Sequence, residues 1–392
     1  MGGDGPVIGA SAAQVALLRR AFDRARYDQA SLEALLGAPD ARLSRDEQRA
    51  LWTWRARSDR DARAVLARLF LLESPVPAAV ARRALGGPGL EAALALALVR
   101  ARGAALEPRA QIGVHAGLLI AGDLELRPAS RGARRDHAAG PTTASILLDR
   151  MTVRRPVARA LDLGCGGGYL ALRLASHATT VQATDVSRRA LRYAALNAAL
   201  NGLDARVRFV VSDRFSGLAG ESFDLITGNL PFVISPEARF VFRDAGLRSD
   251  GFLASVVRAT GRHLVEGGIA QYLAQWVHGE VSDDAAAEEA RLGGWVHAAG
   301  CDALVIRLER DPVDVYATRW IAGPERPLAP DERARRMALW MTYYRRAGIR
   351  AISTGLVCLR RRSRAPHPFA IEESSAGSPP DGDAIASWFD AQ

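Results

Sequence analysis

The sequence predicts an α/β fold, in which a mainly helical N-terminal domain precedes a mostly parallel sheet with helices on its faces. Three patterns support this prediction. Apolar residues recur at helical spacing over 12–100, an apolar run breaks into glycines over 160–172, and short apolar runs alternate with amphipathic stretches over 179–310. We therefore expect a helical domain with a hairpin at 1–130 and an α/β domain at 131–362.

The stretch ALDLGCGGGYLAL (160–172) has the pattern of a strand, a tight turn and a helix. Glycines allow the backbone to turn sharply and a ligand to come close, and the free N–H groups at the start of the helix face that ligand. We therefore expect a nucleotide-like cofactor, bound at Gly164, Cys165, Gly166 and Gly168.

Two common cofactor motifs are absent from this stretch. A dinucleotide fingerprint would require a glycine where Tyr169 stands, and no Gly-Lys-Ser/Thr run follows. Asp162 stands two positions before the first glycine, and its carboxylate can pair with the ammonium of a bound amino acid. S-adenosylmethionine carries such an ammonium. The alternative is a glycine turn without a cofactor in another α/β fold.

The sequence D-L-G-C-G-G-G (162–168) resembles the first motif of class I methyltransferases, and the resemblance extends over roughly residues 135–310. It implies a seven-stranded Rossmann-like sheet and S-adenosylmethionine as the cofactor. We expect no metal at this site.

Two acidic residues stand at the ends of the next two predicted strands: the strand within 179–187 ends in Asp185, and Asp213 follows the strand 206–211. An acidic residue about 20 positions beyond the glycines can hold ribose hydroxyls, which suits Asp185 with its neighbour Val186. In the resembled family an acidic side chain after the third strand binds the adenine amino group. That role suits Asp213 with its neighbour Arg214, and a simple turn is the alternative.

The fourth predicted strand, FDLITG (223–228), leads into the tetrapeptide Asn229, Leu230, Pro231 and Phe232. The tetrapeptide resembles the N/D-P/I/L-P-Y/F/W motif of methyltransferases that act on a nitrogen attached to a planar group. The Asn229 amide oxygen and the Leu230 carbonyl can accept the two N–H bonds of an amino group and so direct its lone pair. Pro231 stiffens the turn, and Phe232 can stack on the planar group. An ordinary turn at the end of a strand is the alternative.

The order of the domains, together with S-D-R-F-S-G-L at 212–218, resembles the release-factor glutamine methyltransferase family, whose version is S-D-W-F-S-A-L. The resemblance implies N-methylation of a glutamine amide in a protein such as a release factor. Two features depart from the family. Its usual Asn-Pro-Pro-Tyr is Asn-Leu-Pro-Phe here, which is closer to adenine N6-dimethyltransferases of ribosomal RNA, and 311–348 forms an insertion.

The acceptor therefore stays open between a protein glutamine, a base in ribosomal RNA or another nucleic acid, and a small molecule. A nucleic-acid-binding regulator without catalysis is a further alternative. The combination of Asp162, Asp185 and Asn229 argues against it, because a ligand sensor would not need Asn229.

The sequence pattern of the N-terminal half predicts two short helices at about 77–84 and 89–101 and a hairpin at 113–128. This order suits a winged helix, but the second helix is too apolar to lie in a DNA groove. A helical cap on the catalytic domain is the favoured alternative. In the linker 131–156, His137 could touch substrate, and a helix could start at one of the residues Thr142, Thr143 or Ser145.

After the acceptor motif we expect strands at 269–277, 303–310 and 351–360, the last two forming an antiparallel hairpin. The insertion 311–348 should contain a helix at about 331–346. The segment 363–392 is rich in Pro, Ser and Gly, and we expect it to be disordered.

The net charge of +9 favours a polyanionic partner such as RNA. However, all 52 basic residues are arginine, so the excess reflects a bias of the whole chain. The densest groups are Arg131/Arg134/Arg135, Arg154/Arg155 and Arg360/Arg361/Arg362/Arg364.

The three cysteines lie far apart without metal-ligand spacing. No apolar run reaches the roughly 20 residues that span a bilayer, and the first residues lack the pattern of a signal peptide. We expect a cytoplasmic protein that does not contact membranes. The oligomeric state stays open.

Overall fold

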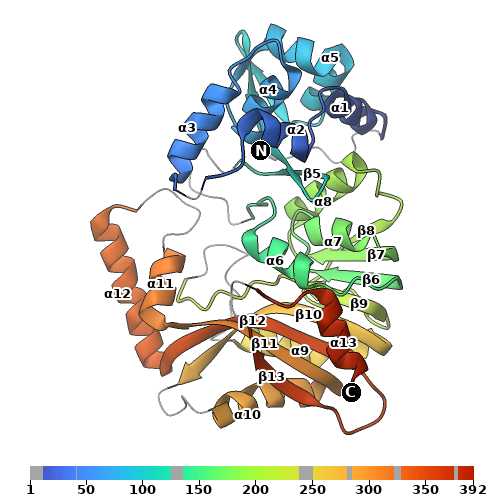
Figure 1. Cartoon of the computed structure of the whole chain (residues 1–392), viewed down its shortest axis with the longest axis vertical. Helices are drawn as coiled ribbons and strands as arrows, with labels where there is room; N and C mark the ends of the chain where they lie inside the picture. The colour runs from blue at the N-terminus through green and yellow to red at the C-terminus, as the bar shows by residue number, and fades with distance from the viewer. Residues whose placement is uncertain are drawn as a thin grey trace.

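The computed structural model describes residues 12–40, 42–124, 136–237, 250–279, 285–321, 328–374 and 378–392. Figure 1 shows two parts stacked along the long axis, with the N-terminal helices at the top and a large sheet below them. The first linker cluster, Arg131/Arg134/Arg135, lies outside the described residues. No helix in the described part combines the length and apolarity needed to cross a bilayer.

The N-terminal part is mainly helical, as the apolar spacing predicts. Its elements are α1 (Ala12–Arg24), α2 (Gln29–Leu36), α3 (Arg45–Arg55), α4 (Ala62–Leu66), a π-helical turn η1 (Ala67–Leu71) and α5 (Ala78–Ala95). Ser44 and Glu47 form a complete capping box at the start of α3, which fixes where that helix begins. Helix α5 is interrupted at Gly86, whose φ is +72°.

A three-stranded sheet completes this part, in the order β1 (Val76–Pro77), β3 (Ala105–Pro108), β2 (Val99–Arg102). The expected second helix at 89–101 therefore ends early, because β2 begins at Val99. A hairpin, β2–β3, follows helix α5 earlier in the chain than the predicted hairpin at 113–128, and the winged helix stays a prediction. The exposed residues after the kink, Pro88, Glu91, Leu94 and Ala95, carry no positive charge, so this face does not suit a nucleic-acid groove.

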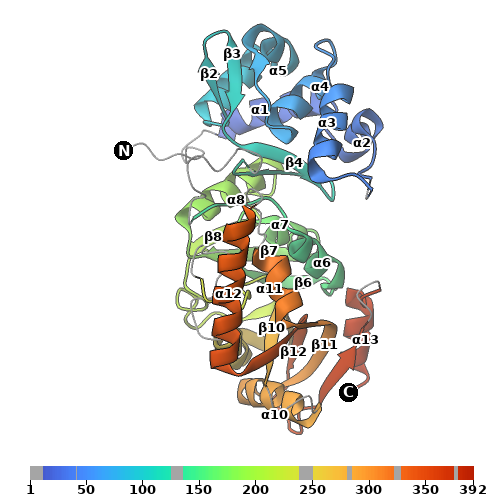
Figure 2. The ribbon, with the colours of Figure 1, turned by 90° about the vertical axis from the view of Figure 1, so that its left-hand side faces the viewer.

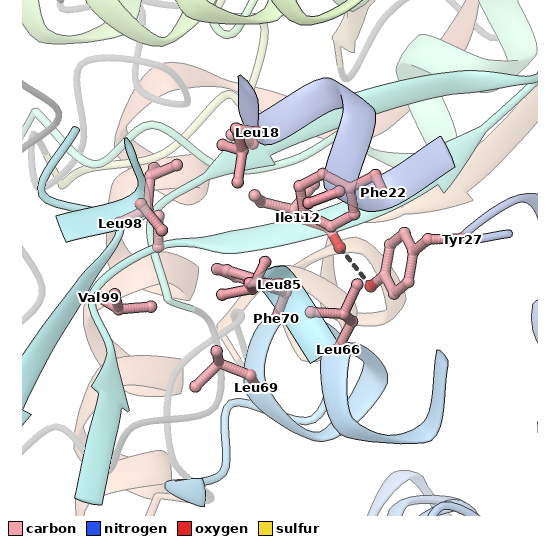
Figure 3. Packing of buried hydrophobic residues seen from close by; sticks show 14 of the residues in the cluster. Leu18, Phe22, Tyr27, Leu66, Leu69, Phe70, Leu85, Leu98, Val99 and Ile112 are labelled. Atoms are coloured by element: carbon pink, nitrogen blue, oxygen red, sulfur yellow. Dashed lines mark hydrogen bonds between the residues drawn. The ribbon is translucent and has the colours of Figure 1, made fainter. Parts of the chain in front are cut away.

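The core of the N-terminal part lies where α1, α4, η1 and α5 meet the strands. Figure 3 shows Leu18, Phe22, Leu66, Phe70 and Leu85 packed together. The buried Tyr27 hydroxyl donates to the Ile112 carbonyl at 2.8 Å, which satisfies a backbone group that would otherwise lose its hydrogen bond on burial.

The predicted hairpin is shorter than 113–128. It consists of β4 (Gln111–His115) and β5 (Leu118–Gly122), and 125–128 fall outside the described residues. Two asparagine side chains bind the backbone of β5. Asn197 on α8 (Arg188–Leu200) and Asn201 at its C-cap lie one helical turn apart. Their amides both donate to and accept from the backbone of Ala121 and Leu119, at 2.8–3.0 Å. Because the core of the N-terminal part also includes one face of α8, the two parts are joined by packing as well.

The large sheet has eight strands, one more than predicted. Their order is β13 (Phe369–Glu373), β11 (Cys301–Pro312), β12 (Ile349–Arg361), β10 (Leu264–Gly279), β9 (Phe223–Gly228), β6 (Val157–Leu163), β7 (Ala178–Asp185) and β8 (Val207–Val211). Strands β8-β7-β6-β9-β10 are parallel, in the doubly wound order 3-2-1-4-5. Strand β12 is antiparallel to both β10 and β11, so the expected antiparallel hairpin is confirmed.

Helices cover both faces of this sheet. One face packs against α6 (Thr143–Met151), α7 (Tyr169–Leu174), α8 and α13 (Gly382–Asp390), and the other against α9 (Gly251–Thr260) and α10 (Ala285–Val296). Two 3-10 turns, η2 (Gly261–His263) and η3 (His297–Ala299), follow α9 and α10. The insertion forms two helices, α11 (Val313–Ile321) and α12 (Pro330–Ala347), which Figure 2 shows in front of the sheet.

The expectation of a disordered tail is wrong for most of its described residues. Strand β13 pairs in parallel with β11, and α13 buries Ile385, Ala386 and Phe389 against the sheet. Pro, Ser and Gly enrichment predicts disorder only on average, and here a few apolar residues at helical spacing bury enough surface to order the segment.

Candidate functional site

The glycine turn between β6 and α7 has three residues in the left-handed region. The φ angles of Gly164, Gly166 and Gly168 are +73°, +53° and +84°. A Cβ at Gly164 would lie 2.8 Å from a methyl group of Leu230, and one at Gly168 would lie 2.9 Å from Ala194. A Cβ at Gly166 would meet nothing within 4 Å. The turn is therefore packed at both ends and open in the middle, as a ligand loop must be.

Asp185, at the end of β7, fixes this turn. Its Oδ2 accepts a hydrogen bond from the Gly166 N–H at 2.9 Å, and its Oδ1 accepts from the Ser187 N–H at 2.7 Å. The Cys165 N–H donates to the Thr184 carbonyl at 2.8 Å. Burial raises the pKa of Asp185, and the backbone donors oppose that shift. Each carboxylate oxygen has a second lone pair, so this side chain can accept further hydrogen bonds from a ligand.

Asp162 is completely buried at the end of β6, and neither of its carboxylate oxygens has a hydrogen-bond partner of normal geometry among the described residues. Burial raises its pKa to about 7, the Asp185 carboxylate adds to the shift, and weak interactions with Ala171 and Thr227 oppose it. Thr227 on β9 is the register partner of Asp162 on β6, and its hydroxyl also has no hydrogen-bond partner within the described chain. Buried polar atoms without partners are rare, so this carboxylate at the end of β6 is a candidate ligand contact.

The other predicted cofactor residues lie at the same edge of the sheet. Val186 follows Asp185 with its side chain 48% exposed, and Asp213 follows β8 with its carboxylate in solvent, 3.3 Å from Arg214 Nε. Arg214 has a φ of +51° and donates to Ser255 at 3.1 Å. Val186 and Asp213 are both exposed at this edge of the sheet, and the Asp213 carboxylate pairs with Arg214.

The acceptor motif begins where β9 ends, beside the glycine turn. Asn229 Nδ2 donates to Ser145 Oγ of α6 at 2.9 Å, while Asn229 Oδ1 is buried and has no partner among the described residues. Leu230 is buried with a methyl group against Gly164. The half-buried Phe232 ring makes an edge contact with Trp320 of the insertion, with centroids 6.1 Å apart. The tetrapeptide therefore presents one unsatisfied oxygen next to the cofactor turn.

The sequence did not reveal two further contributions near the site. Ser145 was predicted only as one possible start of α6, and Thr142 is the N-cap. Asp123, which no motif marks, accepts hydrogen bonds from Tyr193, Arg189 and the Ala138 N–H. Burial would raise the pKa of Asp123, but the Arg189 pair and these hydrogen bonds hold it below its usual value. The spacing of Arg189 and Tyr193, one helical turn apart, is the only signal for this cluster.

His137, a candidate for substrate contact, lies 3.7 Å from the Asp123 carboxylate and belongs to that cluster rather than to the acceptor motif. The cluster fixes the linker beside the start of α8. The linker also crosses the glycine turn, because a Cβ at Gly167 would lie 3.5 Å from the Ala139 carbonyl.

Comparisons with known proteins match both parts of the chain. Residues 140–270 match the model of the methyltransferase small domain, and residues 24–111 match a domain of unknown function (DUF7059). The chain is 35% identical over 144 residues to the ribosomal protein uL3 glutamine methyltransferase of Bradyrhizobium diazoefficiens, covering 34% of this chain and 44% of that protein.

Two other relatives differ in their named substrates. The release factor glutamine methyltransferase of Deinococcus radiodurans is 37% identical over 147 residues, covering 35% of this chain and 51% of that protein. The ribosomal RNA small subunit methyltransferase C of Salmonella arizonae is 35% identical over 127 residues, covering 32% of this chain and 33% of that protein. The chain thus spans about a third to a half of the length of these relatives. Residues 140–270 therefore resemble a methyltransferase small domain and the corresponding part of the glutamine methyltransferases, and the strand order and the glycine turn agree with this resemblance.

Proposed function

We propose that this protein is an S-adenosylmethionine-dependent N-methyltransferase that acts on the side-chain amide of a glutamine in a protein. The observation that supports this most directly is the state of Asn229. Its amide nitrogen donates to Ser145, and its buried oxygen has no partner in the described chain. A buried carbonyl oxygen of this kind needs an N–H donor, and a primary amide supplies one.

The residues at the carboxyl edge of the sheet fit the cofactor. The unpartnered carboxylate of Asp162 would pair with its ammonium group, and the remaining lone pairs of Asp185 would accept from its ribose hydroxyls. Val186 and Asp213 would contact the adenine ring and its amino group. The open side of Gly166 leaves room for this approach. When bound, the cofactor supplies a methyl group activated by the positive sulfonium.

The acceptor amide would then be held by the motif after β9. Asn229 Oδ1 and the Leu230 carbonyl would each accept one N–H of the amide, which directs the nitrogen lone pair out of the amide plane toward the methyl group. Phe232 would stack on the amide plane. This arrangement needs no strong base, because positioning and the charge of the sulfonium provide most of the rate, and one amide proton would leave to solvent late, after the methyl group has transferred.

The choice of acceptor follows from the relatives and from the sequence after β8. Two of the relatives named above are glutamine methyltransferases of proteins, and 212–218 resembles the corresponding stretch of the release-factor family. A base in ribosomal RNA is the second candidate. It is favoured by the Asn-Leu-Pro-Phe form and by the Salmonella relative.

The arginine excess adds little support to the second candidate. Arg154 and Arg155 form ion pairs with Asp149 and Asp390. Arg360 and Arg362 both bind the buried Asp302. All four guanidiniums are engaged by carboxylates, although Asp149 and Asp302 are each shared by two arginines, so they are weaker phosphate ligands than unpaired arginines would be.

Transfer of tritiated methyl from S-adenosylmethionine tests the proposal. Purified release factor, total ribosomal proteins and ribosomal RNA serve as three separate acceptors, with Asn229→Ala as the inactive control. We expect label in a protein, located on a glutamine by mass spectrometry, with a shallow dependence on salt. Label in RNA alone would overturn the proposal, above all if binding falls with a log–log salt slope of about −0.7 per neutralised phosphate.

A further inference from the structure

The far end of the acceptor loop, defined here as residues 229–237, is held by the insertion. The Ile234 N–H donates to the Tyr316 hydroxyl of α11 at 3.1 Å, and the Tyr344 hydroxyl of α12 donates to the Ile234 carbonyl at 2.7 Å. Ile234, Tyr316 and Tyr344 are almost completely buried. Two tyrosines from the insertion thus satisfy both backbone groups of one loop residue, as a neighbouring strand would.

These tyrosines are in turn fixed to the sheet. The Tyr316 hydroxyl donates to Gln275 Oε1 on β10 at 2.5 Å, and Gln275 Nε2 donates to Thr354 Oγ1 on β12 at 3.0 Å. Tyr316 and Tyr344 contact each other edge to face within an apolar cluster that also contains Val277 and Ile352 of the same two strands. The insertion is therefore a rigid extension of the sheet in this region.

A second contact anchors the end of the loop. Arg336 Nη2 lies 2.6 Å from a carboxylate oxygen of Glu237, and Trp340 Nε1 donates to the same oxygen at 3.1 Å. Both partners come from α12, and Arg336 is buried. A buried arginine that is fully paired holds its carboxylate in one position.

The loop is thus held by hydrogen bonds at two of its residues. Ser145 holds Asn229 at one end, and Tyr316 and Tyr344 hold Ile234 at the other. Only residues 230–233 lie between them, and these carry the Leu230 carbonyl and the Phe232 ring. A span of four residues cannot absorb a shift of one end without moving the residues that would meet the acceptor.

We propose that Tyr316 and Tyr344 are positioning residues for methyl transfer: their hydroxyls set the location of the acceptor loop, so the insertion defines the acceptor side of the site. This inference rests on the proposed methyl transfer but not on the acceptor being a glutamine. The hydrogen bonds described above tie the two tyrosines to Ile234 and Gln275, not to Asp162 or Asp185, so we expect cofactor binding not to depend on them.

The test compares Tyr316→Phe and Tyr344→Phe with Tyr27→Phe. Tyr27 is the matched control, because it is also buried and its hydroxyl also donates to a backbone carbonyl, at 2.8 Å, but in the N-terminal core. Methyl transfer is measured at saturating S-adenosylmethionine, well below the melting temperature, into whichever of release factor, ribosomal proteins or ribosomal RNA the wild type labels. Calorimetry gives the cofactor affinity of each variant.

We expect each of the two site variants to lower kcat about tenfold and the double variant about 100-fold, since displacements near 1 Å cost this much at a reacting centre. Cofactor affinity should stay within about twofold, and Tyr27→Phe should keep the wild-type kcat. Glu237→Gln, which weakens the other anchor, should lower kcat in the same way if a tyrosine variant fails to fold.

Equal kcat values for the site variants and Tyr27→Phe would overturn the inference, as would a parallel loss of cofactor affinity. If the wild type labels RNA alone, the glutamine proposal is contradicted. The comparison of the tyrosine variants would still test their positioning role. Absence of label in every acceptor would contradict both.

Discussion

Asn229 and Ser145 are joined by a hydrogen bond of 2.9 Å between the end of β9 and the first turn of α6. Ser145 Oγ also lies 3.2 Å from the hydroxyl of Thr142, the N-cap of that helix. The bond occupies the Asn229 nitrogen and leaves its oxygen free for an N–H donor. In the proposed mechanism, a residue of the linker would therefore determine which atom of the motif meets the acceptor.

Replacing Asn229 with alanine should lower kcat about 10²- to 10³-fold, because one preorganised polar group at the reacting centre is lost. Cofactor affinity should change little, since Asp162 and Asp185 would hold the cofactor. Steady-state transfer and calorimetry measure the two quantities. Wild-type turnover in this variant would contradict a planar nitrogen as the acceptor.

Ser145→Ala should have a smaller effect of the same kind. The Asn229 amide would lose its partner and sample both orientations, so we expect kcat to fall about 3- to 10-fold, the loss of roughly 1 kcal/mol of hydrogen bonding. Ser145→Thr keeps the hydroxyl and should restore most of the rate. If Ser145→Thr is as slow as Ser145→Ala, the effect comes from helix packing and not from this bond.

Much of the methyltransferase domain could be predicted from the sequence, because its signals are local. Glycine residues, strand periodicity and acidic residues at strand ends report on their own segments. The observed strands β9 and β7 match the predicted runs 223–228 and 179–187 to within two residues. Contacts between distant segments leave no such signal. Nothing near Ser145 indicates that its partner lies 84 positions away.

Two predictions that were based on composition are wrong, those of the disordered tail and of the helix end at 101. The tail has few apolar residues, but Ile385, Ala386 and Phe389 all face the sheet. The predicted helix 89–101 runs into β2, because Ala and Leu suit both helix and strand, and only pairing of β2 with β3 decides between the two states.

Asp185→Ala tests the cofactor site. A carboxylate that accepts two ribose hydrogen bonds should contribute on the order of 2–4 kcal/mol, so the affinity for S-adenosylmethionine should fall about 30- to 1000-fold. Calorimetry gives the constant directly. Asp213→Ala, which removes an exposed carboxylate, should weaken binding less. Unchanged affinity in Asp185→Ala would exclude this residue as the ribose ligand.

Phe389→Ala tests whether the tail is part of the fold. Phe389 is completely buried, and the Arg360 guanidinium lies 5.3 Å from its ring centroid. Truncating a buried phenylalanine costs about 3–5 kcal/mol of unfolding free energy, which chemical denaturation measures. The exposed neighbour Ser387 serves as the control, since Ser387→Ala should change stability by no more than about 0.5 kcal/mol. Equal stability of the two variants would instead support the prediction that the tail is disordered.

Asp162 should make both stability and cofactor binding depend on pH. Burial raises its pKa to about 7 in the folded protein, while the unfolded value is about 3.9. Between these values the folded state holds one more proton than the unfolded state, so the free energy of unfolding decreases as pH rises from about 4 to about 7. Binding of an ammonium group requires the ionised carboxylate. The affinity of the free protein for S-adenosylmethionine should therefore fall about tenfold for each pH unit below 7.

Asp162→Asn removes this charge and should separate the pH dependence of stability from that of cofactor binding. The variant should be more stable than the wild type at pH 8 by about 1–3 kcal/mol, less than the full shift implies because the new amide leaves a buried donor unpaired. At pH 5 the gain should disappear, and cofactor binding should be weak and independent of pH. Asp302, equally buried but bound to Arg360 at 2.7 Å, is the matched control, since Asp302→Asn should destabilise the protein at both pH values. Thermal melts and calorimetry from pH 5 to 8 measure these quantities. If Asp162→Asn is less stable than the wild type at pH 8 and binds the cofactor normally, the carboxylate is structural and does not hold the ammonium group.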